Sequence, residues 1–233
     1  MPVITINGPS GSGAVTVGHL VAQEMGLSFV DRMVTTEVAK LVGKPAGALI
    51  NKEQRVDRFR HRFGRFVQNM LERSAMSGVS GEPYFGRGLE TLPPEAYMEL
   101  AGESSATATK VDDKVFIEAM TTVVKNLHRA GNVVIIGRGA NIILANTLGV
   151  MHVGLLAPLD VRVQTIMHRE HFDRDEALAY VEELERARET YFRKFFRLNP
   201  GEPSLYHMML NMGKMEHKTA AEVILHAARD LAS

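Results

Sequence analysis

The sequence predicts an α/β fold in which a parallel β-sheet is covered by helices on both faces. Short β-branched runs alternate along the chain with longer segments whose apolar residues recur every three or four positions, which is the pattern of βα units. The first such run leads into a glycine-rich turn and then directly into a helical pattern. This arrangement favours an anion-binding turn after the first strand of the sheet.

The first βα unit lies at the N-terminus. Residues 3–6 read Val-Ile-Thr-Ile, a β-branched run that predicts a buried strand, and residues 14–25 carry the apolar spacing of a helix. A short strand is expected over residues 27–30. This part of the chain therefore predicts a strand, a turn, a helix and a second strand.

The pattern changes between residues 44 and 110. Residues 52–76 place aromatic residues at spacings of three and four and arginines on the other face, which predicts an amphipathic helix. Sequence rich in Gly, Pro, Ser and Thr follows it. We interpret residues 44–110 as an inserted helical and loop region, on the substrate or lid side or at a homodimer face formed by the 52–76 helix. The chain as a whole, residues 1–233, is interpreted as a single domain.

The alternation of strands and helices resumes after the insertion. The helix expected over 173–197 opens with a capping box, Asp173-x-x-Glu176. The other expected elements are helices over 111–130, 137–146, 158–171 and 216–231, and strands over 133–136, 150–156 and 205–210.

Composition excludes several classes of function. The 27 basic and 27 acidic residues balance, which argues against a general polyanion-binding surface, so nucleic acid is an unlikely partner. With 0 cysteines, disulfides, thiolate zinc sites and a cysteine nucleophile are excluded, and the histidines show no metal-ligand spacing. There is no apolar run long enough for a membrane span and no signal-peptide pattern, so we expect a cytoplasmic location without membrane association.

The turn after the first strand reads GPSGSGAV over residues 8–15. Gly8, Gly11 and Gly13 allow close approach of the backbone and positive φ, so backbone amides and the helix N-terminus can form an anion site. Ala14 and Val15 occupy the positions where a phosphate-binding loop has lysine and then serine or threonine. The alternative is a strand-to-helix turn that binds no ligand.

Several stretches resemble the cytidylate kinase-like family, a branch of the nucleoside monophosphate kinases. The Gly11-Ser12-Gly13 segment matches the short loop of this family, in which the lysine is often absent, and Asp31-Arg32 in FVDR resembles its FYD segment. Further agreement lies in VVIIGRGANIIL (133–144), LLAPLDVRV (155–163), ERARETYF (185–192) and, more loosely, LYHMMLNMGKM (205–215). The resemblance covers both ends of the chain but not residues 44–110.

This resemblance implies a P-loop kinase core of about five parallel strands that binds nucleotides. It implies ATP on the loop, with a pyrimidine monophosphate held opposite by Asp31, Arg32 and Arg138. The ATP-binding positions would be Gly8, Gly11, Ser12, Gly13, Ala14 and Val15. Mg²⁺ is a further candidate cofactor, but no residue is assigned as its ligand.

The chain departs from the family at two places. Ile136 and Gly139 stand where acids flank Gly-Arg, and Tyr206-His207 stands where Tyr-Asp is expected.

Arginines elsewhere are candidates to replace the missing loop lysine, because phosphoryl transfer depends mostly on positioning and charge neutralisation. Arg188 falls within the apolar stripe of the 173–197 helix, so it faces inward and needs an anion or a carboxylate as partner. The resemblance places Glu185-x-x-Arg188 in a lid, where an Asp-x-x-Arg pair contacts phosphates. The alternative is a structural pair between Arg188 and Glu185.

Three other arginines are weaker candidates. Arg138 directly follows a core strand, at the end where α/β sheets bind ligands, and it either clamps a monophosphate or caps a carbonyl. Arg162 and Arg169 lie seven residues apart on one helical face and are lid candidates, although a solvated helix face is the favoured interpretation.

The sequence thus supports two hypotheses. The first is a nucleoside monophosphate kinase-like enzyme that transfers a phosphoryl group from ATP to CMP or a related monophosphate, with Arg188 and Arg138 as catalytic candidates. The alternative is a non-catalytic protein on the same fold that binds a nucleotide or anion as a sensor or assembly element.

Overall fold

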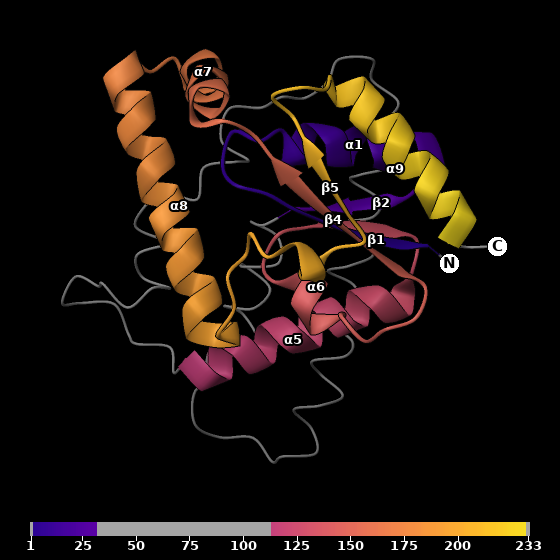
Figure 1. The fold of residues 1–233 in the computed structure, drawn as a ribbon. Helices are drawn as coiled ribbons and strands as arrows, with labels where there is room; N and C mark the ends of the chain where they lie inside the picture. Colours follow the sequence, from indigo (N-terminus) through magenta and orange to yellow (C-terminus); the bar gives the residue numbers. More distant parts are fainter. Residues whose placement is uncertain (1, 32–112, 232–233) are drawn as a thin grey trace.

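The computed structural model describes residues 2–31 and 113–231 (Figure 1). Arg32, the 44–110 region and the predicted 52–76 helix with its homodimer face lie outside these residues. Within the described residues, five parallel strands form one sheet in the order β2-β3-β1-β4-β5. The strands are β1 (Val3–Asn7), β2 (Ser28–Val30), β3 (Val133–Ile136), β4 (Val150–Leu156) and β5 (Met208–Asn211). The predicted α/β class is confirmed.

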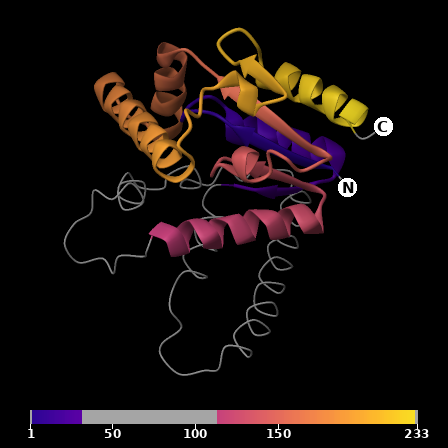
Figure 2. The same cartoon turned by 60° about the horizontal axis from the view of Figure 1, so that its bottom comes forward.

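Helices cover both faces of the sheet, as Figure 2 shows. Helices α1 (Ala14–Met25) and α9 (His217–Leu231) pack on one face. Helices α5 (Asp113–Ala130) and α6 (Ala140–Ile143) pack on the other. Side chains alternate along β1: Ile4 and Ile6 join the α1–α9 core, whereas Val3 joins the α5–α6 core.

A helical pair stands beside this sandwich. Helix α7 (Leu159–Glu170) packs along α8 (Arg174–Phe196) through a separate apolar cluster (Figure 1). The predicted capping box is present, with the Glu176 amide donating to Asp173 Oδ1 over 2.9 Å and the Asp173 amide donating to Glu176 Oε2 over 3.0 Å. The last turns of α8 reach the α5–α6 core, so this helix spans from the α7 pair to the sheet.

Two predicted elements are shorter than expected. The helix predicted over 137–146 is only α6, because Gly137, Arg138 and Gly139 all have positive φ, 69°, 57° and 69°, which is incompatible with a right-handed helix. The strand predicted over 205–210 begins at Met208, because Pro203–Leu205 forms a 3₁₀ turn before it.

A polar contact lies within the buried layer of the sheet. The Thr5 hydroxyl of β1 lies 2.8 Å from Nδ1 of the buried His152 on β4. The backbone N–H of His152 donates to Nδ1 of His207 over 3.0 Å. Burial and, to a smaller extent, the neighbouring His207 lower the pKa of His152 to about 4, although the Leu144 backbone opposes both. His152 is therefore neutral at neutral pH.

We expect the free energy of unfolding to fall on acidification below about pH 6.5. The folded pKa of His152, about 4, lies below its ordinary value of 6.5, so the unfolded chain binds a proton that the folded chain excludes. The contribution is complete above pH 6.5 and is lost towards pH 4, by about 3 kcal/mol in total. Urea unfolding between about pH 7 and 4.5 measures it. His152→Gln, which keeps an acceptor for Thr5, should lose less stability over this range, and equal losses would contradict the assignment.

Candidate functional site

The glycine loop joins the end of β1 to the start of α1. Gly11 and Gly13 have φ of 79° and 80°, and Gly13 is the N-cap of α1 without any side-chain cap. The first intrahelical bond is donated by the Val17 amide to the Gly13 carbonyl, over 2.9 Å. The amides of residues 14–16 therefore have no acceptor within the helix, and they converge at its positive end, where an anion is stabilised.

Each loop glycine is also required by close packing. A Cβ on Gly11 would lie 2.6 Å from the Arg162 carbonyl oxygen and 2.9 Å from its Cα, both backbone atoms. A Cβ on Gly8 would meet the Ser12 hydroxyl, and one on Gly13 would meet the His217 ring. The loop is thus held between the first turn of α7 and the start of α9.

Two serine hydroxyls of the loop are buried. The side chains of Ser10 and Ser12 are 5% and 1% exposed, and within the described part of the chain neither hydroxyl has a hydrogen-bond partner. A buried hydroxyl without a partner costs free energy, which a bound acceptor would relieve. Both residues line the pocket described next, so the loop fits a phosphate-bearing ligand.

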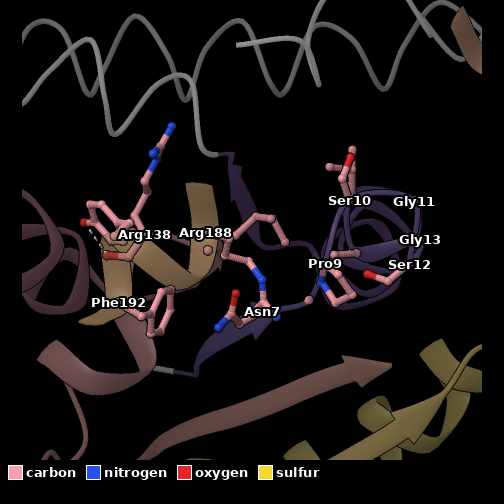
Figure 3. Close-up of a pocket in the computed structure, with 15 residues that line it drawn as sticks. Asn7, Pro9, Ser10, Gly11, Ser12, Gly13, Arg138, Arg188 and Phe192 are labelled. Atoms are coloured by element: carbon pink, nitrogen blue, oxygen red, sulfur yellow. Dashed lines mark hydrogen bonds between the residues drawn. The ribbon is translucent and has the colours of Figure 1, made fainter. Parts of the chain in front are cut away.

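The loop forms one wall of a pocket that is open to solvent. In Figure 3 the loop residues lie on one side, Arg138, Arg188 and Phe192 lie on the other, and Asn7 lies between them. Ile136, Gly137 and Tyr191 complete the opposite wall. The pocket therefore brings together residues that the sequence separates widely.

Arg188 reaches this pocket from α8. Its side chain is 12% exposed, and it donates to both carboxylate oxygens of Glu185, from Nη2 over 2.9 Å and from Nε over 3.3 Å. Its Cζ also lies 6.0 Å from the Phe192 ring centroid, a cation–π distance. Arg188 is thus paired with Glu185, as one of its two alternatives predicted, and it also lines the pocket.

Arg162 shares the same carboxylate. Its Nη1 lies 3.5 Å from Glu185 Oε2, and its side chain is 13% exposed, so the solvated helix face favoured for it is wrong. Burial lowers the pKa of Arg162, Glu185 raises it, and Arg188 lowers it. Two guanidinium groups on one carboxylate leave one positive charge in excess, beside the glycine loop that Arg162 touches through its backbone.

Of the remaining site residues predicted from the sequence, some line the pocket and others do not. Arg138 and Asp31 are buried, and Arg138 lines the pocket, where its carbonyl accepts a bond from the Tyr191 hydroxyl over 3.3 Å. Arg169 pairs with the adjacent Glu170, Nε to Oε1, over 2.6 Å. Ala14 and Val15 line the pocket and are partly packed against the α1–α9 core.

The sequence did not predict seven of the residues that line this pocket. They are Asn7, Pro9, Ser10, Ile136, Gly137, Tyr191 and Phe192. Tyr206 is not part of the lining but contacts Asn7, whose side-chain amide donates to the phenol oxygen over 2.8 Å. Burial raises the pKa of Tyr206, whereas the bond from Asn7 and the charge of Arg188 lower it. The only signal in the sequence for Asn7 is that it directly precedes Gly8, which places it beside the glycine loop.

Comparison with known proteins identifies relatives of this chain. A model of the cytidylate kinase-like family matches residues 3–214. A curated cytidylate kinase from Sulfolobus acidocaldarius is 28% identical over 82 residues, 35% of this chain and 45% of that protein. A curated uronate isomerase from Corynebacterium glutamicum is 25% identical over 92 residues, 40% of this chain and 18% of that protein. The chain therefore spans less than half the length of each of these curated relatives.

A solved structure of an uncharacterized protein from Eubacterium ventriosum shares the fold. It aligns with a TM-score of 0.63 and 16% identity, covering 98% of this chain and 99% of that one. With the family match, the predicted P-loop kinase core is confirmed. Among the described helices, none combines the length and apolar character that a membrane span requires.

Replacing Gly11 with alanine should destabilise the protein more than replacing Gly26. Both residues have positive φ, so each substitution costs about 1 kcal/mol of backbone strain. A Cβ on Gly26 meets nothing within 4 Å, whereas one on Gly11 meets the Arg162 backbone, which cannot turn aside. We expect Gly11→Ala to cost a further 1–3 kcal/mol or so in urea unfolding. Equal losses for the two variants would show that the loop is not packed on α7.

Proposed function

Because the chain belongs to the cytidylate kinase-like family, we propose that it transfers a phosphoryl group from ATP to CMP or a related pyrimidine monophosphate. The observation that carries the proposal is the pocket in which the glycine loop faces Arg188. In such a reaction the bond between the γ-phosphorus and its bridging oxygen breaks, and a new bond forms to a phosphate oxygen of the acceptor. Catalysis of this step requires positioning and neutralisation of charge.

The loop side of the pocket would hold ATP. The free amides at the start of α1 suit the phosphates, and the buried Ser12 hydroxyl supplies a donor that has no partner among the described residues. Gly8, Gly11 and Gly13 would allow the phosphates to approach the backbone. Arg188 would neutralise the charge that develops on the transferring group, since it faces the loop across the pocket.

The opposite side would hold the acceptor. Arg138 lies on this wall, at the carboxyl end of β3, and a guanidinium there suits a monophosphate. Asp31 and Arg32 are further acceptor candidates, Arg32 lying outside the described residues. Arg162 would support Arg188 through the carboxylate that they share, and Arg169 is a more distant lid candidate.

The residues that line the pocket do not fit a bound Mg²⁺, although they fit a phosphate group. Hard divalent cations prefer oxygen ligands, above all carboxylates. Within the described residues, the pocket lining includes no carboxylate, and Val15 has no hydroxyl. We therefore derive no step through a metal.

A non-catalytic role is the second candidate. The absence of the loop lysine and hydroxyl favours a protein that binds a nucleotide or anion as a sensor or assembly element. Such a protein would need the loop amides and Arg188 but no charge stabilisation in a transition state. A cytoplasmic location and a homodimer formed through the 52–76 helix remain predictions.

Arg188→Met should weaken ATP binding by about tenfold or more while the protein stays folded. Methionine suits the apolar stripe of α8, and Glu185 keeps Arg162 as a partner, so the loss falls mainly on the ligand. Isothermal titration with ATP measures the affinity, and Tm measures the fold. Arg186→Met is the matched control, because it removes the same charge from an exposed position two residues away. If both variants bind ATP like the wild type, Arg188 is purely structural.

Restoring the loop by Ala14→Lys with Val15→Thr should strengthen ATP binding by one to two decades or so. A lysine there reaches the β- and γ-phosphates, and the hydroxyl can hold a metal. Val15 is partly packed against the α1–α9 core, so a threonine could lower stability. Ala14→Lys alone separates the two effects. A folded double variant without any gain in ATP affinity would favour the non-catalytic candidate, and a coupled phosphoryl-transfer assay of the wild type would decide between them.

A further inference from the structure

A chain of hydrogen bonds leads from the pocket to the segment that follows α8. The side-chain amide of Asn7 donates to the Tyr206 hydroxyl over 2.8 Å, and this hydroxyl donates to the Pro200 carbonyl over 2.6 Å. Asn7 is buried and lines the pocket. One phenol oxygen therefore both accepts from the pocket wall and donates to a remote part of the backbone.

One end of this chain lines the pocket, and the other lies in the segment that follows the helix carrying Arg188. Asn7 is the last residue of β1 and directly precedes Gly8, the first residue of the glycine loop. Pro200 lies four residues after Phe196, where the helix carrying Arg188 ends. The two bonds thus connect Asn7, which precedes the glycine loop, to the segment after α8, and their partners are 199 and 6 residues apart in the sequence.

The aromatic ring of Tyr206 packs against the sheet through contacts that do not involve its hydroxyl. A Cβ on Gly154 of β4 would lie 3.2 Å from the Tyr206 Cγ, so the ring packs against a glycine of the sheet. A phenylalanine at this position would therefore keep the ring contact and lose only the hydroxyl. Tyrosine is suited to the position because a phenol can accept from an amide and donate to a carbonyl at the same time.

We propose that Tyr206 is a positioning residue of the pocket, whose hydroxyl ties the end of β1 to the segment after α8 and thereby fixes the placement of the helix that carries Arg188. The effect of this hydroxyl on nucleotide binding rests on the proposed function, whereas its effect on the placement of Arg188 is independent of that function.

The electrostatics of Tyr206 agree with this role. Burial raises its pKa, so the phenol stays protonated and can donate to Pro200. The bond from Asn7 lowers this pKa, and so does the charge of Arg188. Residues from β1 and α8 therefore both act on this one oxygen.

A double-mutant cycle measures the coupling. Tyr206→Phe should weaken ATP binding about five- to tenfold in the wild-type background, because the hydrogen-bonded tie between Asn7 and the segment after α8 is lost. In the Arg188→Met background the same substitution should change the affinity less than about twofold, because the group that it positions is already absent. No loss in the wild-type background, or an equal loss in both backgrounds, would overturn the proposal.

A matched control separates positioning from general stability. Tyr180→Phe removes a phenol hydroxyl from the same helix as Arg188, but in the apolar cluster between α7 and α8. It should leave ATP affinity unchanged, and its Tm is measured beside that of Tyr206→Phe. If Tyr180→Phe weakens ATP binding as much as Tyr206→Phe, the effect is one of stability and the proposal fails.

A measurement on nucleotide-free protein tests the positioning role of Tyr206 separately from the proposed kinase function. The Nε–H of Arg188 donates to Glu185, so its ¹⁵N resonance reports the placement of this side chain, and Arg188→Met assigns it. Tyr206→Phe should shift or broaden this resonance, and Asn7→Leu, which breaks the chain at its other end, should do the same. If the resonance moves but wild-type protein binds no ATP, the proposed function fails and the positioning role stands. An unmoved resonance in either folded variant would overturn the positioning role, whether or not ATP binds.

Discussion

The site depends on the burial of β1 between β3 and β4. Parallel pairing places Ile6 opposite Ile136 and Asn7 opposite Gly154, so neighbouring strands end at one edge of the sheet. The segments that leave this edge are the glycine loop and the Gly137–Gly139 turn, which form facing walls of one pocket. A shift of one residue in β1 would turn its apolar side chains to the opposite faces, so the cores on both faces hold the pocket in place.

Charge in this pocket comes from its far wall and not from its loop. A loop with Ala14 and Val15 offers amides and hydroxyls but no cation. Arg162 and Arg188 share Glu185, and this cluster carries one positive charge in excess. Because both side chains are largely buried, that charge is less screened by solvent than a surface charge, and a nearby anion is the group that would compensate it best. Glu185 also holds both guanidinium groups before any ligand arrives, which lowers the entropic cost of binding.

Sequence patterns predicted the parts of the site that depend on local geometry. The glycines at 8, 11 and 13 indicate positive φ and close packing, and both are present at Gly11 and Gly13. The inward direction of Arg188 followed from helical periodicity and its position in an apolar stripe. The same periodicity could not show that Arg162 is buried, because the groups that pack against it belong to α8 and to the glycine loop. Tyr206 and His152 were missed as well, since their partners lie 199 and 147 residues away.

The sequence by itself determined the order of strands and helices, the α/β class and the turn that can bind an anion. These features follow from hydrophobic periodicity, from the backbone freedom of glycine and from capping residues, all of which act over a few neighbouring positions. Only the tertiary structure decided which residues face each other across the pocket, which carboxylate Arg188 and Arg162 share, and which hydroxyl joins Asn7 to the segment after α8. The physical reason is that strand order and helix docking bring together groups whose separation along the chain carries no signal in a single sequence.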